Sequence, residues 1–347
     1  MSITVRRMET SDKSKWDEFV EHCPSATFFH KSAWATVLQR AFGHRCHYLL
    51  AENNGEIEGV LPLAQVKSML FGHSLSSLPF CVYGGIASTS LGASEALRHT
   101  ACELANTLQV DALELRNIQP SDSGWPSKDT YSTFRKAIDA DNEVNIMAIP
   151  NRQRAMIRKG IKEGLVSTEV TDTARLYQVY SESVRNLGTP VFSRVYFDIL
   201  REEFGEDCRM LMILDGAGED AEDVAGVMSF YFRGEVLPYY GGSIARARSI
   251  KGCNHFMYWE LMRRSAEEGM TSFDFGRSKV GSGPYSFKKN WGFSPEPIPY
   301  EYYLVNTDTM PNVTPNNPKY RFLIETWSRL PLPIANFLGP YLAKNLG

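Results

Sequence analysis

The sequence predicts an α/β (α+β) protein in which one mixed sheet with its helices is formed twice along the chain. The first observation is length, because 347 residues exceed one ordinary core and suggest about two domains. The second is an internal repeat, in which apolar runs, turns and an amphipathic helix follow in the same order in both halves. The third is the strand–helix–strand order within each half, which places parallel strands side by side.

The predicted elements of the two halves correspond. Each half has two strand-length apolar runs joined by a turn, then a third strand, an amphipathic helix and a last strand. In the first half these segments are 46–66, 78–86, 94–108 and 111–117. In the second half they are 208–232, 236–243, 254–269 and 271–278.

Short matching stretches at a nearly constant offset define the repeat. The matched pairs are Gly59-Val60 with Gly226-Val227, Tyr83-Gly84-Gly85 with Tyr240-Gly241-Gly242, and Glu114-Leu115 with Asp274-Phe275. We therefore expect residues 1–145 and 150–305 to share one fold, with the two Tyr-Gly-Gly stretches on equivalent strands.

Charge is uneven along a chain whose formal net charge is −3. Basic residues concentrate at 151–162 and 245–252, and the acidic run 215–223 is expected in an exposed loop. The net charge argues against a surface that attracts polyanions everywhere. The basic runs instead predict a local anion site in the second half.

Other features favour a cytoplasmic protein. No apolar stretch approaches the roughly 18 to 20 residues that span a bilayer, and the opening residues lack the apolar segment of a secretory signal. The six cysteines are scattered without a Cys-x-x-Cys pair, which predicts reduced thiols. Strand alternation sends Cys46 and His47 to opposite faces, so no metal site is predicted at 44–47.

Four stretches follow one another in a characteristic order: "NRQRAMIRKGIKEGLVSTEV", "LPYYGGS", "FDFGRS" and "GPYSFKKNWGF". Their order resembles the acetyltransferase-like (GNAT) fold in tandem and, more closely, the FemAB family of aminoacyl and acyl transferases, and the last stretch is similar to that family's Phe-Lys signature. The resemblance covers nearly the whole chain. The stretch "GVLPLAQVKSMLFG…LSSLPFCVYGG" is similar to a bacterial subgroup associated with exosortase (PEP-CTERM) and exopolysaccharide gene clusters.

The resemblance implies an N-acyltransferase that passes an acyl or aminoacyl group to an amine of a cell-envelope, peptidoglycan or exopolysaccharide precursor. It implies a first GNAT-like domain at 1–148, a second with the donor site at 149–305, and a helical tail at 306–347 packed on the first domain. No tightly bound cofactor is expected. Acyl-CoA or aminoacyl-tRNA is the expected donor substrate, so tRNA is a candidate partner and DNA is not. Two alternatives stay open: a coenzyme A-dependent acetyltransferase, and a non-catalytic scaffold of an envelope-assembly system.

The segment 276–293 provides candidate catalytic residues. We expect "YSFKKNWGF" to form a strand, with Lys288 pointing across the cleft and Lys289 on the opposite face. Lys288 is then a cation for an oxyanion or a phosphate, as the Phe-Lys signature implies, and a solvated strand lysine is the alternative. Asp274 is a candidate base, with an ion pair to Arg277 or Arg248 as its alternative.

The second copy also has candidate residues for binding a donor's phosphates. Arg248, Lys251 and Gly252 precede the predicted helix at 254, where backbone N–H groups favour anions. Only Gly252 fits the usual phosphate loop of coenzyme A enzymes. The matching turn of the first half, "STSLGAS", has no basic residue, so the second copy is the better phosphate site. Arg158 of the basic helix is a further candidate.

The remaining candidates are expected to line a cleft between the domains. "LGTPVFSRVYFDIL" resembles a family segment in which an arginine and a tyrosine face the cleft, and Arg194 and Tyr196 match them. An exposed structural arginine is the alternative for Arg194. Tyr239 and Tyr240 precede two glycines, where backbone can approach a ligand. We expect one tyrosine to contact the substrate, with Tyr240 as a third catalytic candidate, and the other to be core.

The tail from 317 onward has a long apolar face with few charges. We expect Phe322, Trp327 and Phe337 to be buried against the first domain. Peripheral contact with a membrane, or with a partner, is the alternative.

Overall fold

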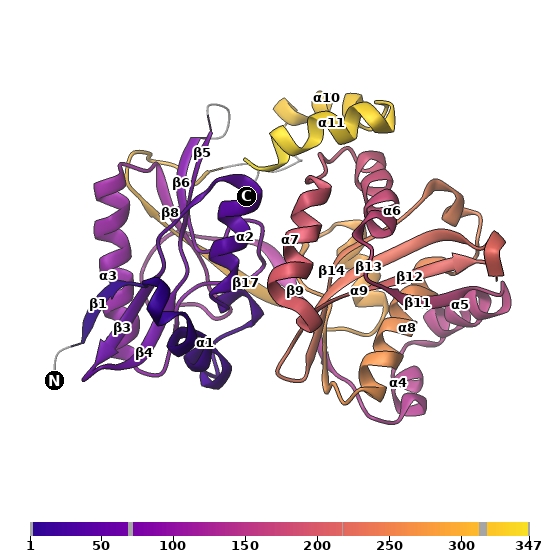
Figure 1. Ribbon diagram of the computed structural model, residues 1–347, viewed down its shortest axis with the longest axis horizontal. Helices are drawn as coiled ribbons and strands as arrows, with labels where there is room; N and C mark the ends of the chain where they lie inside the picture. Colours follow the sequence, from indigo (N-terminus) through magenta and orange to yellow (C-terminus); the bar gives the residue numbers. More distant parts are fainter. Residues whose placement is uncertain (1–2, 69–71, 217, 312–317, 346–347) are drawn as a thin grey trace. The chain divides into compact units, whose positions relative to one another are not determined.

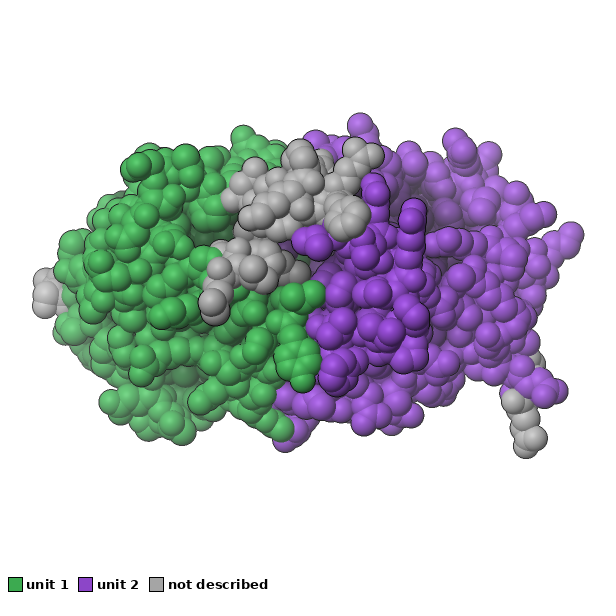
Figure 2. All heavy atoms as spheres, turned by 90° about the horizontal axis from the view of Figure 1, so that it is seen from above, with its two compact units in different colours: residues 1–131, 297–317, 341–347 green, residues 132–296, 318–340 purple. Residues whose placement is uncertain are grey.

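The computed structural model describes residues 3–68, 72–216, 218–311 and 318–345, with backbone alone at 219 and 318–322 (Figure 1). It divides into two compact units, coloured in Figure 2. Unit 1 comprises residues 1–131, 297–317 and 341–347, and unit 2 comprises residues 132–296 and 318–340. Neither unit is continuous in sequence, unlike the predicted domains that change at 148 and 305.

Unit 1 contains two sheets. The strands of the first follow the order β1-β3-β4-β7 and are antiparallel. They are β1 (Thr4–Arg7), β3 (Leu49–Asn53), β4 (Glu56–Leu61) and β7 (Ala87–Ser88). The second sheet contains the order β9-β17-β8-β6-β5-β2, in which β6 and β8 are parallel. These strands are β2 (Arg45–Cys46), β5 (Ala64–Ser68), β6 (Gly72–Ser76), β8 (Ala112–Arg116), β9 (Ser127–Thr133) and β17 (Glu296–Leu304).

Helices cover these sheets. They are α1 (Lys13–His22), α2 (Ala33–Phe42) and α3 (Leu91–Leu108), with short 3-10 turns at Thr10–Asp12 and Phe28–His30. α3 begins at Ser90, whose side chain accepts a hydrogen bond from the N–H of Ala93, and it packs on β3 and β4. Gly59 of β4 permits this packing, since a Cβ there would lie 2.9 Å from Leu97.

Unit 2 is built on one sheet with strand order β10-β15-β14-β13-β12-β11. Its strands are β10 (Arg135–Ala137), β11 (Val166–Val170), β12 (Cys208–Asp215), β13 (Glu222–Phe232), β14 (Glu235–Ser243) and β15 (Ser272–Asp274). A short strand β16 (Ser278–Lys279) follows β15. The helices are α4 (Asn142–Ala148), α5 (Asn151–Lys162), α6 (Thr173–Asn186), α7 (Arg194–Phe204), α8 (Cys253–Glu267), α9 (Gly283–Asn290) and α10 (Pro318–Trp327). Three 3-10 turns occupy Gly205–Asp207, Gly218–Asp220 and Ala245–Arg248.

Two adjacent glycines of β14 show that helices cover both faces of this sheet. A Cβ on Gly241 would meet the hydroxyl of Tyr258 on α8 at 3.4 Å. A Cβ on Gly242 would meet Ser183 of α6 at 2.7 Å. Because successive strand residues point to opposite faces, α6 and α8 lie on opposite sides of the sheet (Figure 1). Gly242 is therefore required for the close approach of α6.

The repeat predicted from the sequence is present in the strand order. In unit 1, β1-β3-β4-β7 corresponds to β11-β12-β13-β14 in unit 2. Gly59 and Gly226 lie on corresponding strands, opposite Ser88 and Gly242 respectively. They face different helices, since a Cβ on Gly59 would meet Leu97 of α3 and one on Gly226 would meet Leu176 of α6.

The predicted equivalence of the two Tyr-Gly-Gly stretches is wrong. Tyr83-Gly84-Gly85 lies in the loop between β6 and β7, whereas Tyr240-Gly241-Gly242 lies within β14. The difference arises because β5 and β6 are inserted between β4 and β7, with no counterpart between β13 and β14. Gly84 has a φ of +129°, so the glycine there serves a turn.

The tail does not pack as expected. Its segment 318–340 groups with unit 2. In helix α11 (Leu332–Ala343), the side chain of Phe337 is exposed to 68%. Trp327 is half-buried, and the side chain of Phe322 lies outside the described residues. Two glycines allow α10 and α11 to pack closely on unit 2. Gly188 lies against Ile324 of α10, and Gly339 of α11 lies against Val191. Across the described ranges, no helix is long and apolar enough to cross a membrane.

The contact at Gly188 generates a stability prediction. Gly188 has a φ of +75°, and a Cβ there would lie 2.4 Å from Ile324 Cγ2 and 2.6 Å from its carbonyl oxygen. Gly188→Ala is expected to destabilise the protein by about 2–4 kcal/mol, because backbone strain and a clash with α10 add together. Thermal and urea unfolding of the full chain measure this.

Gly164→Ala is the matched control for that variant. Gly164 also belongs to unit 2 and has a φ of +79°, but no atom lies within 4 Å of the position of its Cβ. It should lose only about 1 kcal/mol from backbone strain. Equal losses in both variants would show that α10 is not held at Gly188.

Candidate functional site

The candidate site begins where two parallel strands of unit 2 separate. β14 and β15 are paired at only two positions, Glu235 with Ser272 and Val236 with Phe273. β14 then continues to Ser243, so β15 provides no register partner for its second half. The second half of β14 therefore has backbone groups that β15 does not pair, and backbone N–H and C=O groups are obligatory hydrogen-bonding groups.

A bulge lies in the same part of β14. Met228 of β13 opposes Tyr240, but its neighbour Ser229 opposes Pro238, so Tyr239 has no opposed residue. Bulges re-aim side chains and occur often beside active sites. The bulge and the separating strands together mark the second half of β14 as the place where unit 2 can receive a ligand.

Two of the predicted tyrosines contact each other. The hydroxyls of Tyr196, at the start of α7, and Tyr240 are 2.7 Å apart, and both side chains are buried. Burial, together with Tyr196 and Tyr239, raises the pKa of Tyr240 well above its ordinary value. Tyr240 is therefore a neutral hydroxyl rather than a proton acceptor. Tyr239 is half-buried, with its ring 5.2 Å from Phe230, so Tyr240 is the core tyrosine of the pair.

Arg194 precedes Tyr196 by two residues in the sequence. It is the first residue of α7, and its side chain is exposed. Its Nε is 3.8 Å from Asp198 Oδ2, one helical turn later. Its charge also acts on Tyr177, whose pKa is raised by burial and lowered in part by Arg194. The role of Arg194 in binding stays a prediction.

Asp274, at the end of β15, is completely buried. Its Oδ1 accepts hydrogen bonds from the Thr133 hydroxyl at 3.2 Å and from the Gly276 N–H at 2.7 Å. Its Oδ2 is 3.5 Å from Nε of Arg135 on β10. The sequence analysis missed Arg135, and no local signal marks it, since the pairing joins strands far apart in sequence. These bonds fit a carboxylate that orders the strand end better than a base that meets a substrate.

The predicted strand around Lys288 is wrong, because residues Gly283–Asn290 form helix α9. The signal was present: Ser282 caps the helix by accepting from the N–H of Tyr285, and Pro284 occupies its first turn. The predicted assignment of Lys288 and Lys289 to opposite strand faces therefore fails. Lys289 is exposed, as a solvated lysine would be.

Lys288 instead points back to the end of β15. Its Nζ donates to the carbonyl oxygens of Phe275, Gly276 and Arg277, at 2.6, 3.0 and 3.1 Å. The ring of Phe134 lies 5.6 Å from the ammonium. Burial lowers the pKa of Lys288 to about 8, against the opposing effect of Asp274. All three ammonium protons are used within the protein, so Lys288 holds the strand end.

The predicted phosphate-binding residues lie around a tight helix contact. Gly252 precedes α8 with a φ of +84°, and a Cβ there would lie 2.1 Å from the carbonyl oxygen of Met156 on α5. A Cβ on Gly160 of α5 would lie 2.8 Å from Phe256 of α8. The two glycines let α5 and α8 touch through their backbones. Packing thus accounts for Gly252 without a ligand.

This contact brings the basic helix α5 beside the basic turn before α8. Arg246 of the turn is ion-paired with Asp215 and Glu222. The other exposed cations on the two segments are Arg152, Arg158, Lys159, Lys162, Arg248 and Lys251. Within the described part of the chain, none of these six forms an ion pair with a carboxylate. These six residues are therefore the candidates for the local anion site that the basic runs predict, and that site stays a prediction.

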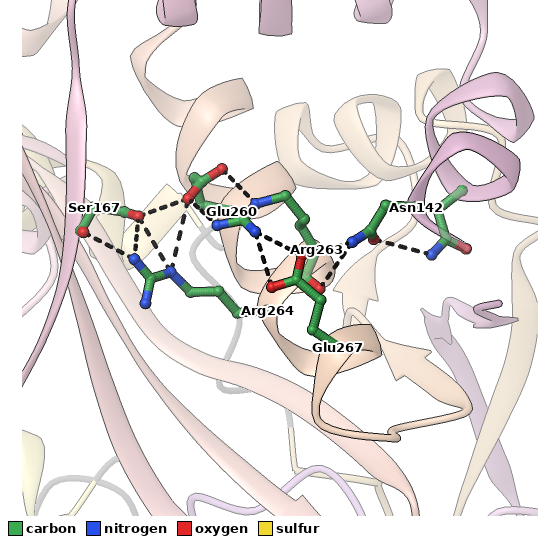
Figure 3. Close-up of polar contacts among 7 residues, drawn as sticks. Asn142, Ser167, Glu260, Arg263, Arg264 and Glu267 are labelled. Atoms are coloured by element: carbon green, nitrogen blue, oxygen red, sulfur yellow. Dashed lines mark hydrogen bonds and ion pairs between the residues drawn. The ribbon is translucent and has the colours of Figure 1, made fainter. Parts of the chain in front are cut away.

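Other cations of α8 are compensated, which sets the six apart. Figure 3 shows that Arg263 donates to both oxygens of Glu260 and to Glu267. Arg264 and Glu260 both bond to Ser167 of β11. Although burial acts to raise it, the pKa of Glu260 is held below its ordinary value by the bonds from Arg263 and Ser167. These residues attach α8 to the sheet and carry no free charge toward a ligand.

Metal ligands are not gathered in any described region: no group of three or more His, Cys, Asp or Glu side chains there is placed to hold an ion. In the segment 44–47, His44 hydrogen-bonds through Nε2 to the carbonyl oxygen of Lys344 at 2.8 Å, and His47 is buried.

Comparison with known proteins agrees with this architecture. Residues 151–289 match the family profile described as "Acetyltransferase (GNAT) domain", and no curated protein matches the chain. The crystal structure of FemX is similar over 92% of this chain and 100% of that chain, with a TM-score of 0.67 and 15% identity. L-PGS from Bacillus licheniformis is similar over 94% and 99%, with a TM-score of 0.56 and 14% identity.

A tandem GNAT protein from the clavulanic acid biosynthesis pathway is similar over 89% of this chain and 100% of that chain, with a TM-score of 0.55 and 11% identity. The predicted fold of two tandem GNAT-like domains is therefore confirmed, and the similarity to FemX is a similarity of fold. The assignment to the exosortase-associated subgroup stays a prediction.

The hydroxyl pair generates a prediction that separates coupling from simple packing. Tyr240→Phe and Tyr196→Phe are each expected to cost about 1–2 kcal/mol, because each removes the hydrogen-bond partner of a buried hydroxyl. The double variant should cost clearly less than the sum, since no hydroxyl is left without its partner. Urea unfolding of the four proteins measures the coupling, and additive losses would contradict it.

The contacts of Lys288 generate a second prediction. Lys288→Met keeps the aliphatic stem but leaves three carbonyl oxygens without their donor, so a loss of about 1–3 kcal/mol is expected. Lys289→Met changes an exposed neighbour on the same helix and should stay within about 0.5 kcal/mol of the natural protein. A larger loss at Lys289 would refute the assignment.

The lowered pKa of Lys288 also predicts a pH dependence of the protein's stability. Lys288 has a folded-state pKa of about 8, below the ordinary value of 10.5. Between these values the unfolded chain binds more protons than the folded one, so stability rises with pH. The stability advantage of the natural protein over Lys288→Met should therefore grow from about pH 8 to about pH 10. A flat difference would mean that the carbonyl bonds keep the ammonium protonated.

Proposed function

We propose that unit 2 transfers an acyl or aminoacyl group from an activated, phosphate-bearing donor to an amine of a cell-envelope or polysaccharide precursor. The observation that carries the proposal is the separation of β14 and β15 at a bulge, within the segment that matches the GNAT acetyltransferase profile. Separated parallel strands let an extended acyl carrier meet strand backbone, as a third strand would.

The chemistry requires a neutral amine that attacks the acyl carbonyl carbon. A C–N bond forms, the bond from carbon to the carrier's sulfur or oxygen breaks, and the amine releases a proton. The tetrahedral intermediate needs donors for its oxyanion. Backbone N–H groups of the second half of β14, which β15 leaves without ladder partners, are our candidates for these donors.

The proton is proposed to leave through the substrate, the leaving carrier or water. Tyr240 has a pKa raised by burial, and Asp274 is buried and hydrogen-bonded at the strand end. Lys288 donates all its ammonium protons to carbonyl groups. We therefore assign Asp274 and Lys288 to positioning the end of β15, and Tyr196 and Tyr240 to shaping the floor beside the bulge.

The donor is proposed to be aminoacyl-tRNA. The cations from Arg152 to Lys162 extend along most of α5. At 1.5 Å per residue, this row of cations is roughly 15 Å long. In a DNA duplex, each strand carries one phosphate per about 3.4 Å of helix axis. A row of cations of this length can therefore contact several phosphates of a nucleic-acid backbone such as that of tRNA. A single pyrophosphate, as in coenzyme A, would engage fewer of them. The fold shared with FemX supports the same class of reaction.

Binding of the donor tests the proposal directly. The full chain is titrated with labelled tRNA and with acetyl-CoA at several salt concentrations. The double variant Arg158→Ala/Lys162→Ala should weaken tRNA binding and reduce the slope of log affinity against log salt by about one per cation removed. Lys289→Ala, which removes an exposed cation from α9, should leave the affinity for tRNA and its salt dependence unchanged.

Transfer is then followed from labelled aminoacyl-tRNA into lipid-linked and nucleotide-linked amino precursors. Label in a precursor that depends on the full chain supports the proposed reaction. Binding of acetyl-CoA without tRNA binding would favour the coenzyme A-dependent alternative, and binding of neither donor would favour the scaffold.

A further inference from the structure

Helix α11 exposes its large apolar side chains and buries its small ones. Ala335 and Gly339 are buried, four residues apart, and Gly339 contacts Val191 of unit 2. The outward positions form a stripe at the i, i+3, i+4 and i+7 spacing of one helix face. Their exposed fractions are Ile334 47%, Phe337 68%, Leu338 40% and Tyr341 62%. An ordinary surface helix has the opposite arrangement, with its apolar face toward the core.

Neighbouring elements extend this apolar face. Leu323 of α10 is exposed to 59%, and Ile324 beside it contacts Gly188, which follows the exposed Leu187. Asn336 fixes the rotation of α11 by donating to the buried Ser181 hydroxyl at 3.3 Å. The stripe is thus held outward by contacts on the opposite side of the helix.

The sequence of the C-terminal segment that contains the stripe is positively charged. Between 318 and 347 the cations are Lys319, Arg321, Arg329 and Lys344, and Glu325 is the one acidic side chain. This segment is therefore cationic in a chain whose net charge is −3. Tyr341 and the half-buried Trp327 are residue types that prefer the boundary between water and lipid.

We propose that α11 lies in the headgroup region of an anionic lipid bilayer, with Ile334, Phe337, Leu338 and Tyr341 entering the lipid. Its 12 residues measure roughly 18 Å, too short for a hydrocarbon core of about 30 Å, so the contact is along the surface. Apolar side chains beside cations bind anionic membranes by two additive effects. The inference is independent of the proposed transfer reaction.

Vesicle flotation tests this proposal with the full chain. Vesicles of phosphatidylcholine containing about one quarter phosphatidylglycerol are compared with phosphatidylcholine alone. The natural protein should float with the anionic vesicles. Phe337→Glu should reduce the partition coefficient roughly tenfold or more, and Ile334→Glu should act in the same direction. Arg329→Gln should weaken binding by about fivefold, only with anionic vesicles.

Leu91→Glu is the matched control, because Leu91 is exposed to 77% on α3 of unit 1 and undergoes the same chemical change. It should float like the natural protein, and unchanged melting temperatures should show that all variants are folded. The proposal is overturned if the natural protein floats with neither kind of vesicle, or if Leu91→Glu loses as much binding as Phe337→Glu. It is also overturned if Phe337→Glu abolishes self-association in sedimentation while no protein binds lipid, since a second copy then covers the stripe.

Discussion

The candidate site depends on how the end of β15 is held after it leaves β14. Two parallel strands that pair at two positions would ordinarily leave carbonyl groups without partners, which is costly in a protein interior. Lys288 meets this cost from α9 by donating to three successive carbonyl groups, and Asp274 orders the turn through the N–H of Gly276. A cation and a carboxylate, both provided from within unit 2, thus hold the chain that leaves β15 after its pairing with β14 ends.

The sequence predicted the double α/β fold because hydrophobic periodicity and the strand–helix–strand order depend on local residues. It failed where a single residue pattern serves two purposes. The Tyr-Gly-Gly stretch of the first half makes a turn, whereas that of the second half lies in a strand between two helices. The stretch containing Lys288 alternates like a strand, yet Ser282 and Pro284 start a helix. Capping residues were stronger evidence there than alternation.

The candidate site was predictable in part. Tyr196 and Tyr240 were named from motif order, and they contact each other through their hydroxyls. The roles expected of Asp274, Lys288 and Gly252 stay predictions, because each of these residues also makes packing contacts or hydrogen bonds that only the folded chain displays. Arg135 could not be found, since it reaches Asp274 from a strand distant in sequence. The expected burial of Phe337 was wrong for a related reason. The apolar residues of α11 have the spacing of a buried face, but the small residues Ala335 and Gly339 occupy the side that packs.

The discontinuity of the units also bears on how the protein is made. Strand β17 pairs with β8 in unit 1, but it is encoded after almost all of unit 2. At ordinary rates of protein synthesis, the interval between β8 and β17 lasts roughly 10 to 40 s. During that time the edge of β8 that β17 will cover is exposed on the growing chain, and exposed strand edges invite association with other chains. Unit 2 can complete its sheet on the ribosome first, so unit 1 finishes folding last although most of it precedes unit 2 in sequence.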